Sequence, residues 1–180
     1  DRHRPEGTIV YCDIQRSGRG QRGNSWESEP YKNITVSLLL RPEHIPANRQ
    51  FLLSEIVSLA TVDVLNRYAT GFSIKWPNDI YWHDKKIAGI LIENVLSGST
   101  FSRAIIGMGL NINQKNFYSD APNPVSLYQI TGRTYKIEKI LDEFTEAFGK
   151  RYTDTFTNSS DRIHKEYIAA LYRNDGVYPF

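Results

Sequence analysis

The chain has 180 residues, the usual size of one domain, and 40% of them are hydrophobic, which is enough to form a core. The formal net charge of +2 argues against nucleic acid or membrane as partner, and we find neither an apolar stretch of about 18 residues nor a signal peptide. The single cysteine, Cys12, excludes an internal disulfide and fits a reducing, cytoplasmic compartment. Because Cys12 lies in an apolar strand, we expect its side chain to pack in the core.

The first half of the chain predicts two strands followed by a long helix. Thr8–Tyr11 is apolar and β-branched, and Ile34–Leu40 reads as a second strand. Apolar residues then recur at three- to four-residue spacing over 48–69, which predicts a helix with one broad apolar stripe. We expect Gly71 to end this helix, as glycine commonly does at helix C-termini.

The middle of the chain predicts four further strands. They cover residues 72–76, 80–82, 87–92 and 101–113. Pro77 stops the first of them, and a turn at 83–85 joins the next two into a hairpin. The third is apolar at nearly every position, which is typical of a strand covered on both faces. A second turn is expected at 97–99.

The last third of the chain predicts helices. Apolar and aromatic residues recur at helix spacing from Ile137 to Phe156, a stripe that indicates core packing, and a second helix covers 162–172. The order of strands, helix, strands and helices predicts an α/β or α+β domain. We expect a mixed β-sheet flanked by helices, because the strict alternation of a doubly wound fold is missing.

The glycine-rich segment 18–23 matches the pattern G-x-G-x-x-G, but the common forms of that pattern do not fit its surroundings. A dinucleotide fingerprint needs a helix after the loop, whereas residues 24–32 contain Pro30 and no apolar periodicity. The kinase lysine, H-R-D and D-F-G motifs and a Walker A motif are also missing from the sequence. Taken alone, the segment is equally compatible with a flexible hairpin connection.

Residues in and beside this segment nevertheless indicate a ligand site. Glycines leave backbone N–H groups open to an anion, and Arg19 and Arg22 can clamp carboxylate or phosphate oxygens. Trp26 can cover a flat ring. Together these features predict a pocket for an acid and a nucleotide.

Two further motifs place charged residues at strand ends. Asp79, in the segment Lys75–Asp79, is suited to carry a magnesium ion or to orient a base, although Asn-Asp is also ordinary turn chemistry. Lys86 is either a solvated turn lysine or a point charge for a carboxylate and an α-phosphate. Gly89, inside the following strand, is typical of close approach by a ligand or another backbone.

The segment 107–113 combines two glycines with asparagine side chains. Asn111 offers a donor and acceptors to a purine or ribose, and a β-bulge is the structural alternative for this segment. The four histidines lack the spacing of a zinc site, and no G-x-S-x-G elbow occurs.

The order and spacing of four segments closely resemble the catalytic domain of biotin protein ligases. These segments are 15–26, 75–79, 86–93 and 107–113. The resemblance implies a mixed sheet flanked by helices, related to class II aminoacyl-tRNA synthetases and lipoate ligases. It also implies that Mg-ATP converts biotin to biotinyl-5′-AMP, and that the biotinyl group then passes to one lysine of a biotin carboxyl carrier protein.

The resemblance assigns roles by motif position. It implies contacts to biotin or its adenylate for Gln15, Gly18, Arg19, Gly20, Gln21, Lys86 and Gly89. It implies contacts to the nucleotide for Arg22, Trp26, Asn78 and Asn111. Catalysis would rest on Lys86, Asp79 and Arg19, with Lys86 stabilising charge during adenylation. Asp79 would help the chemistry or the metal, and the metal ligands themselves stay unknown.

The chain departs from the family pattern at several points. Gln21 stands where many members have an arginine that orders the loop over the adenylate, so adenylate retention is expected to be looser or to depend on Arg22. A Ser-Thr-Asn segment that meets the biotin ring is expected upstream of residue 1. A small SH3-like domain is expected to start at 177–180, which leaves 1–176 as the catalytic domain.

We therefore expect the core of a longer ligase, without a winged helix for DNA binding and compatible with a homodimer. Two alternatives stay open. A lipoate-type acid–protein ligase would share the fold, although the Lys75–Asp79 motif with a Gly-Arg-Gly loop favours biotin. A non-catalytic biotin-binding regulatory module would bind biotin without turning over ATP.

Overall fold

The computed structural model describes residues 4–98, 100–157 and 160–178, and its centre is a six-stranded sheet whose neighbouring strands pair antiparallel. In spatial order the strands are β1 (Ile9–Tyr11), β4 (Ile34–Leu40), β8 (Thr100–Leu110), β7 (Lys85–Ser97), β6 (Asp79–Trp82) and β5 (Phe72–Lys75). A separate two-stranded ribbon consists of β2 (Gly18–Arg19) and β3 (Ser25–Trp26).

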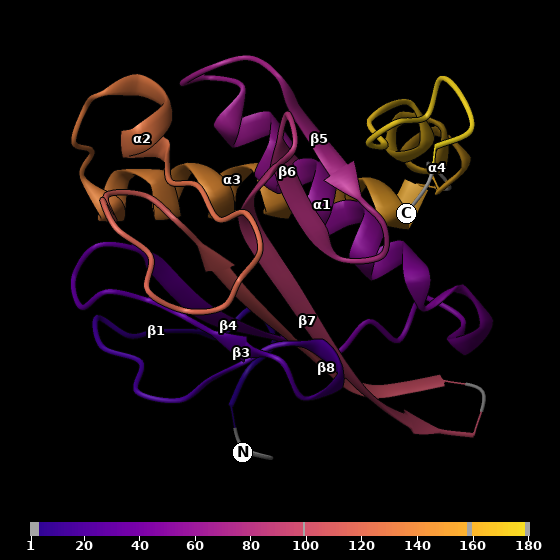
Figure 1. Ribbon diagram of the computed structural model, residues 1–180. Helices are drawn as coiled ribbons and strands as arrows, with labels where there is room; N and C mark the ends of the chain where they lie inside the picture. Colours follow the sequence, from indigo (N-terminus) through magenta and orange to yellow (C-terminus); the bar gives the residue numbers. More distant parts are fainter. Residues whose placement is uncertain (1–3, 99, 158–159, 179–180) are drawn as a thin grey trace.

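Helices cover one face of this sheet. They are α1 (Phe51–Leu65), α2 (Leu127–Thr131), α3 (Ile137–Asp154) and α4 (Ser160–Ala169). Helix α1 packs against β5, β6 and β7, α3 and α4 pack on α1, and Figure 1 shows α1 and α3 behind the strands. The predicted α+β fold with a sheet flanked by helices is confirmed. Its parallel component is confined, in the described ranges, to the isolated bridges Ile74–Leu171 and Lys86–Pro124.

The predicted strands are confirmed with small shifts of their ends, but one expectation about β7 is wrong. Helices do not cover both of its faces. Ile87, Ala88 and Ile90 are buried in the core, whereas Gly89 and Leu91 line a cavity on the other face. The predicted segment 87–92 is continuously apolar because its two cavity-facing positions, 89 and 91, are glycine and leucine rather than polar residues.

The long predicted helix is confirmed as α1, but its pattern and its end differ from the prediction. Most residues of α1 are buried, rather than only those of a single stripe. The reason is that the sheet covers one side of the helix while α3 and α4 cover other sides. It begins at Phe51, after a 3₁₀ turn over Ala47–Arg49. It ends at Leu65 rather than near Gly71, whose positive φ of 95° instead serves the turn into β5.

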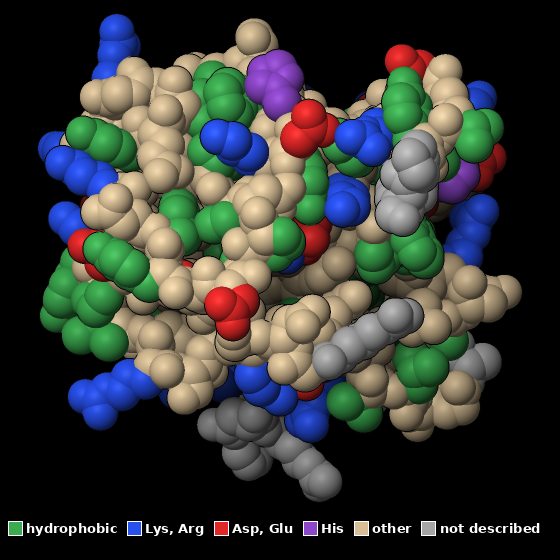
Figure 2. All heavy atoms as spheres, in the orientation of Figure 1, with side chains coloured by type: hydrophobic (Ala, Val, Ile, Leu, Met, Phe, Trp, Pro, Cys, Tyr) green, Lys and Arg blue, Asp and Glu red, His purple; other side chains and the backbone are tan. Residues whose placement is uncertain are grey.

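The C-terminal helices follow the predicted pattern. In α3, Ile140, Phe144 and Phe148 are buried, which confirms this part of the aromatic stripe as core. The predicted end of the stripe is wrong, because α3 stops at Asp154 and Phe156 is 60% exposed. Helix α4 covers the predicted second helix over Ser160–Ala169 and ends three residues before the predicted 172. Within the described ranges, no helix has both the length and the apolar character needed to cross a membrane. Figure 2 shows acidic and basic side chains interspersed over this view, in keeping with the small net charge.

Arg151 joins three of the helices. Its Nε and Nη2 donate to Oδ2 and Oδ1 of Asp63 in α1 at 2.6 and 2.9 Å. Its Nη1 donates to Oε2 of Glu166 in α4 at 2.7 Å. The Arg151 side chain is only 16% exposed, and its planar guanidinium links two carboxylates that stay partly exposed to water.

We expect Arg151→Met to lower the free energy of unfolding by about 2 kcal/mol, because both carboxylates lose their shared cation while staying partly hydrated. Urea unfolding at neutral pH measures the change. Lys150→Met removes the same charge at the neighbouring exposed position and is expected to stay within about 0.5 kcal/mol of the parent. An equal loss in both variants would contradict the three-helix role of Arg151.

Candidate active site

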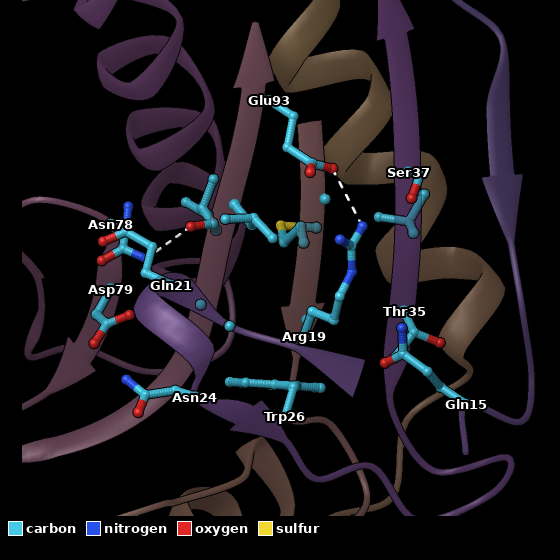
Figure 3. A pocket seen from close by; sticks show the side chains of 18 of the residues that line it. Gln15, Arg19, Gln21, Asn24, Trp26, Thr35, Ser37, Asn78, Asp79 and Glu93 are labelled. Carbon is cyan, nitrogen blue, oxygen red and sulfur yellow. Dashed lines mark hydrogen bonds and ion pairs between the residues drawn. The ribbon is translucent and has the colours of Figure 1, made fainter. Parts of the chain in front are cut away.

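A cavity of about 460 Å³ opens on the face of the sheet that α1 and α3 leave uncovered. Its walls come from the segment after β1, the β2–β3 ribbon and strands β4, β6, β7 and β8. Figure 3 shows the lining side chains, with the ribbon in front of the sheet. The cavity brings together these sequence-predicted residues: Gln15, Arg19, Gly20, Gln21, Trp26, Asn78, Asp79, Lys86 and Gly89.

Three glycines form the floor of the cavity, which we call the glycine floor (Gly89, Gly107 and Gly109). Gly89 pairs with Gly109 between β7 and β8, and Gly107 follows two residues before Gly109 on the same face. Glycine at these positions leaves the sheet without side chains under the cavity. The predicted close approach to Gly89 is made by side chains rather than by another backbone, because a Cβ there would lie 3.2 Å from the Trp26 ring.

The indole of Trp26 lies directly on the glycine floor. A Cβ on Gly109 would fall 2.3 Å from Cε2 and 2.4 Å from Nε1 of Trp26, which is far too close for atoms that are not bonded to each other. The Trp26 Nε1 is buried and has no hydrogen-bond partner among the described residues. A buried donor of this kind favours a ligand acceptor nearby, since leaving it unpaired costs about 1–3 kcal/mol.

A β-bulge turns Lys86 toward the cavity. Relative to β6, one extra residue, Ile87, stands in β7 between Lys86 and Ala88. Ile87 and Ala88 are both buried in the core, and Lys86 shares the cavity face with Gly89. In an unbroken strand Lys86 would lie on the same face as Ala88, so the bulge is what delivers a cation to the site.

Lys86 and Asp79 form the tightest ion pair of the cavity. The Lys86 Nζ lies 2.7 Å from the Asp79 Oδ1, and their side chains are 29% and 20% exposed. The same Nζ lies 5.7 Å from the centre of the Trp26 ring, within range of a cation–π contact. Asn78 lines the cavity beside them and donates from Nδ2 to the Ile90 carbonyl at 2.8 Å, which fixes its orientation.

The main chain of Lys86 is held by the segment 123–125. Its N–H donates to the Asn123 carbonyl at 2.8 Å, and its carbonyl accepts from the Val125 N–H at 2.9 Å. Lys86 thus has a parallel bridge to Pro124 in addition to its pairing with Tyr81 of β6. A lysine with a fixed main chain loses less rotational freedom when its ammonium group meets an anion.

The predicted nucleotide contact through Asn111 stays a prediction. Asn111 lies just beyond β8, is 2% exposed and does not line the cavity. Its Nδ2 donates to the Val125 carbonyl at 3.1 Å, and its N–H donates to the Ile87 carbonyl at 2.9 Å. Its Oδ1 is buried and has no hydrogen-bond partner among the described residues.

The glycine-rich segment forms the hairpin ribbon β2–β3. Arg19, Gly20 and Gln21 line the cavity, but Gly18 does not. Gly18 instead packs against its neighbours, since a Cβ there would lie 2.5 Å from the Trp26 carbonyl oxygen and 2.8 Å from Gln15 Oε1. Glycine is needed at this position for close approach, and the predicted biotin contact of Gly18 stays a prediction. The Arg22 side chain lies outside the described part of the chain.

Sequence reasoning missed several cavity-lining polar residues, among them Thr35, Ser37 and Glu93. Thr35 and Ser37 come from β4, where they pair with Gly109 and Gly107 of the floor, and Glu93 comes from β7. The first two alternate with buried apolar residues in the segment Ile34–Leu40, which was a readable signal. Glu93 continues the alternation from Gly89 along the same face of β7.

The prediction that Cys12 packs in the core is wrong. Cys12 follows the last residue of β1, is only half-buried and lines the cavity. Its Sγ lies 3.2 Å from Thr35 Oγ1, which itself donates to the Cys12 carbonyl at 2.6 Å. The short edge strand ends before the cysteine, so the apolar run of the sequence overstated the extent of the core.

Glu27, next to Trp26, anchors the end of the ribbon to residues 114–119. Its carboxylate accepts from the N–H groups of Ser119 at 2.7 Å and Tyr118 at 3.0 Å, and from Gln114 Nε2 at 3.0 Å. Burial raises the pKa of Glu27, but the hydrogen bonds from Ser119, Tyr118 and Gln114 outweigh it and bring this pKa below its ordinary value.

We expect Glu27→Gln to lower the free energy of unfolding by about 1 kcal/mol at neutral pH, because hydrogen bonds to a charged acceptor become bonds to a neutral one. A depressed carboxyl pKa stabilises the fold fully above the ordinary value of 4.5, and this stabilisation is lost as the pH falls through the folded-state pKa. Urea unfolding between pH 7 and pH 3.5 should show the gap between parent and variant closing below about pH 4.5.

The exposed Glu29→Gln, two residues along, is the matched control and is expected to leave stability unchanged at neutral pH. A gap between the parent and Glu27→Gln that stayed constant down to pH 3.5 would show that charge on Glu27 has no role.

The described residues contain no group of three or more His, Cys, Asp or Glu side chains arranged to hold a metal ion. The acidic side chains that line the cavity are Asp79 and Glu93, and each faces a cation. A divalent ion would therefore depend on ligand oxygens as well as on the protein, which is the usual situation for Mg²⁺ bound with phosphates.

A glycine-floored cavity lined by a lysine–aspartate pair and an arginine-bearing ribbon defines a domain that binds an anionic ligand. The chain belongs to the biotin/lipoate A/B protein ligase family, whose model matches residues 2–111. Its relatives within that family include biotin–[acetyl-CoA-carboxylase] ligase of Paracoccus denitrificans, which is 32% identical over 171 residues, covering 91% of this chain and 70% of that protein. The predicted resemblance to the catalytic domain of biotin protein ligases is confirmed.

Longer relatives and solved structures agree with this family. Bifunctional ligase/repressor BirA of Bacillus subtilis (strain 168) is 35% identical over 159 residues, and the match covers 86% of this chain. The chain spans about half, 48%, of the length of that relative. The biotin protein ligase from Aquifex aeolicus in complex with biotin and ATP has a TM-score of 0.82 and 26% identity, covering 94% of this chain and 70% of that one.

Proposed function

We propose that this chain is the catalytic domain of a biotin protein ligase, which activates biotin with ATP and passes the biotinyl group to a lysine of a biotin carboxyl carrier protein. The observation that carries the proposal is the Lys86–Asp79 pair at 2.7 Å, held over the glycine floor opposite Arg19. Support comes from the Aquifex aeolicus structure, whose ligands are biotin and ATP. Residues 1–176 would form this domain, with a further domain starting near 177.

In the first half-reaction, a carboxylate oxygen of biotin attacks the α-phosphorus of ATP. The new acyl–phosphate bond forms as the bond to pyrophosphate breaks, and pyrophosphate leaves. Both reactants are anions, so the ammonium of Lys86 and the guanidinium of Arg19 lower the barrier by meeting the charge that builds up between them. Mg²⁺ would arrive with the nucleotide and neutralise phosphate charge, with Asp79 as the cavity carboxylate suited to hold it.

In the second half-reaction, the neutral Nζ of the acceptor lysine attacks the acyl carbon of biotinyl-5′-AMP. The amide bond forms, AMP leaves, and the proton of the attacking nitrogen goes to a base. Asp79 would orient the acceptor amine, a role supported by its ion pair with Lys86 at 2.7 Å, which would bring it close to the reacting carbonyl. Gln15, Gly20, Gln21 and Gly89 would contact biotin or its adenylate, and Trp26, Asn78 and Arg22 would contact the nucleotide. A homodimer and a cytoplasmic location stay predictions.

The experiment that tests the proposal detects the acyl-adenylate by mass spectrometry. The chain is incubated with Mg-ATP and either biotin or lipoate. Selective formation of biotinyl-AMP would support the ligase half-reaction. Selective formation of lipoyl-AMP would instead show that the acid substrate is lipoate rather than biotin. Biotin binding by calorimetry without any adenylate would instead favour a non-catalytic biotin-binding module.

A further inference from the structure

Arg19 has an internal partner across the mouth of the cavity. Its Nη2 lies 3.4 Å from Oε2 of Glu93, and the two side chains are 76% and 51% exposed. Arg19 belongs to β2 of the ribbon, whereas Glu93 belongs to β7 of the central sheet. Figure 3 shows the Arg19 side chain extending past the floor toward Glu93. The pair therefore joins the two-stranded ribbon to the central sheet across the cavity.

The two ion pairs of the cavity differ in how easily they can be exchanged. The charged side chains that line it, in the described part of the chain, are Arg19, Asp79, Lys86 and Glu93, so its cations and acids balance. The Lys86–Asp79 pair is closer and better buried, at 2.7 Å. The Arg19–Glu93 pair is longer, uses one guanidinium nitrogen and is open to water, which makes it the weaker of the two.

Glu93 disfavours the binding of an anion in this cavity in two ways. The anion must compete with the Glu93 carboxylate for the Arg19 guanidinium, and it is repelled by the like charge of that carboxylate. Both effects have the same sign, and both vanish for a ligand without charge. A carboxylate or phosphate that does bind can use the full bidentate fork of Arg19, which the 3.4 Å contact to Glu93 does not.

We infer that Glu93 is a positioning residue that acts through Arg19 and sets how tightly the site holds an anionic ligand. This inference rests on the proposed function, in which Arg19 meets the carboxylate of biotin and the phosphate of its adenylate. Glu93 weakens retention of both, so it favours release of the adenylate to the acceptor over tight storage. The residue determines affinity rather than the chemical step.

Calorimetry with biotin and with uncharged biotinamide tests this role. Glu93→Gln is expected to bind biotin about two- to fivefold more tightly than the parent, at low salt, and to bind biotinamide with unchanged affinity. The gain should shrink as salt rises, because exposed charges are screened. In an Arg19→Gln background, Glu93→Gln should yield a smaller gain, since the competition for the guanidinium is gone.

Glu43→Gln, an exposed change of the same charge outside the cavity, controls for net charge and is expected to leave both affinities unchanged. An equal gain for biotin and biotinamide, or no gain for either, would overturn the role of Glu93 while leaving the proposed function intact. A parent protein that binds neither compound would overturn the proposed function, and the role of Glu93 with it.

Discussion

Lys86→Met is expected to reduce the rate of biotinyl-AMP formation by about 10²–10³-fold, the loss typical when one preorganised electrostatic group is removed from a reaction site. Methionine keeps an unbranched side chain beside Gly89, whose Cβ position lies 3.4 Å from Lys86 Cε. The variant therefore removes the charge with little change in packing. The expected loss lies in the chemical step, because the ammonium matters most where negative charge accumulates between carboxylate and phosphate.

Single-turnover measurement of adenylate by mass spectrometry gives this rate directly. Lys85→Met is the matched control, because Lys85 is the exposed neighbour in the same hairpin and does not line the cavity. We expect its rate to stay within about twofold of the parent. A Lys86→Met protein that unfolds at the parental temperature and still forms adenylate at the parental rate would refute the assigned role.

Gly109→Ala is expected to weaken ligand binding by about 5- to 150-fold, because the added methyl group claims the space of the Trp26 indole. Its Cβ would lie 2.3 Å from the ring, so the indole must leave the glycine floor. Overpacking of this kind costs about 1–3 kcal/mol, which corresponds to that range of affinity. The ribbon that carries Trp26 can move more easily than the central strand, so the site should lose its shape while the sheet persists.

Gly107→Ala provides the control on the same strand. A Cβ there would meet the Leu91 carbonyl oxygen at 3.5 Å, which is ordinary contact. Tryptophan fluorescence should shift to the red in Gly109→Ala and remain parental in Gly107→Ala, because only the first displaces an indole into water. Trp26→Phe in the Gly109→Ala background assigns the shift to this ring. Parental affinity in Gly109→Ala would show that the indole does not need the glycine floor.

Much of the fold could be predicted because a helix or strand with one buried face has apolar residues at a regular spacing in the sequence. The stripe from Ile140 to Phe148 and the alternation of β4 both record contact with the core. The end of α1 at Leu65 could not be predicted in this way. It depends on where the chain must turn to reach β5, and Gly71, the visible signal, serves that turn instead.

The site was predicted best where its residues are close in sequence. Arg19, Asp79 and Lys86 each lie in a local motif, and the structure brings them into one cavity. The alternation of β4 marked Thr35 as facing away from the core, but that Thr35 and Glu93 meet in one cavity follows from the register between β4, β8 and β7, which are far apart in the chain. Local patterns do not specify that register.

The orientation of the Asn111 side chain could not be predicted for a related reason. The motif places Asn111 correctly at the end of β8, but whether its amide turns to a ligand or to the polypeptide depends on the segment 123–125, which comes later in the chain. The Ile87 bulge likewise leaves no mark in the sequence, although it decides which face of the sheet receives Lys86.

The separation of the β2–β3 ribbon from the central sheet has a consequence for engineering the substrate range. The reacting groups Lys86 and Asp79 are fixed by ladder pairing, whereas Arg19 sits on a ribbon of two-residue strands with few bonds of its own. Grafting a different ribbon between residues 15 and 26 would therefore leave Lys86 and Asp79 in place while exchanging Arg19 and Trp26. A change of the accepted acid by this route requires that the grafted ribbon again supplies a cation and an aromatic ring over the glycine floor.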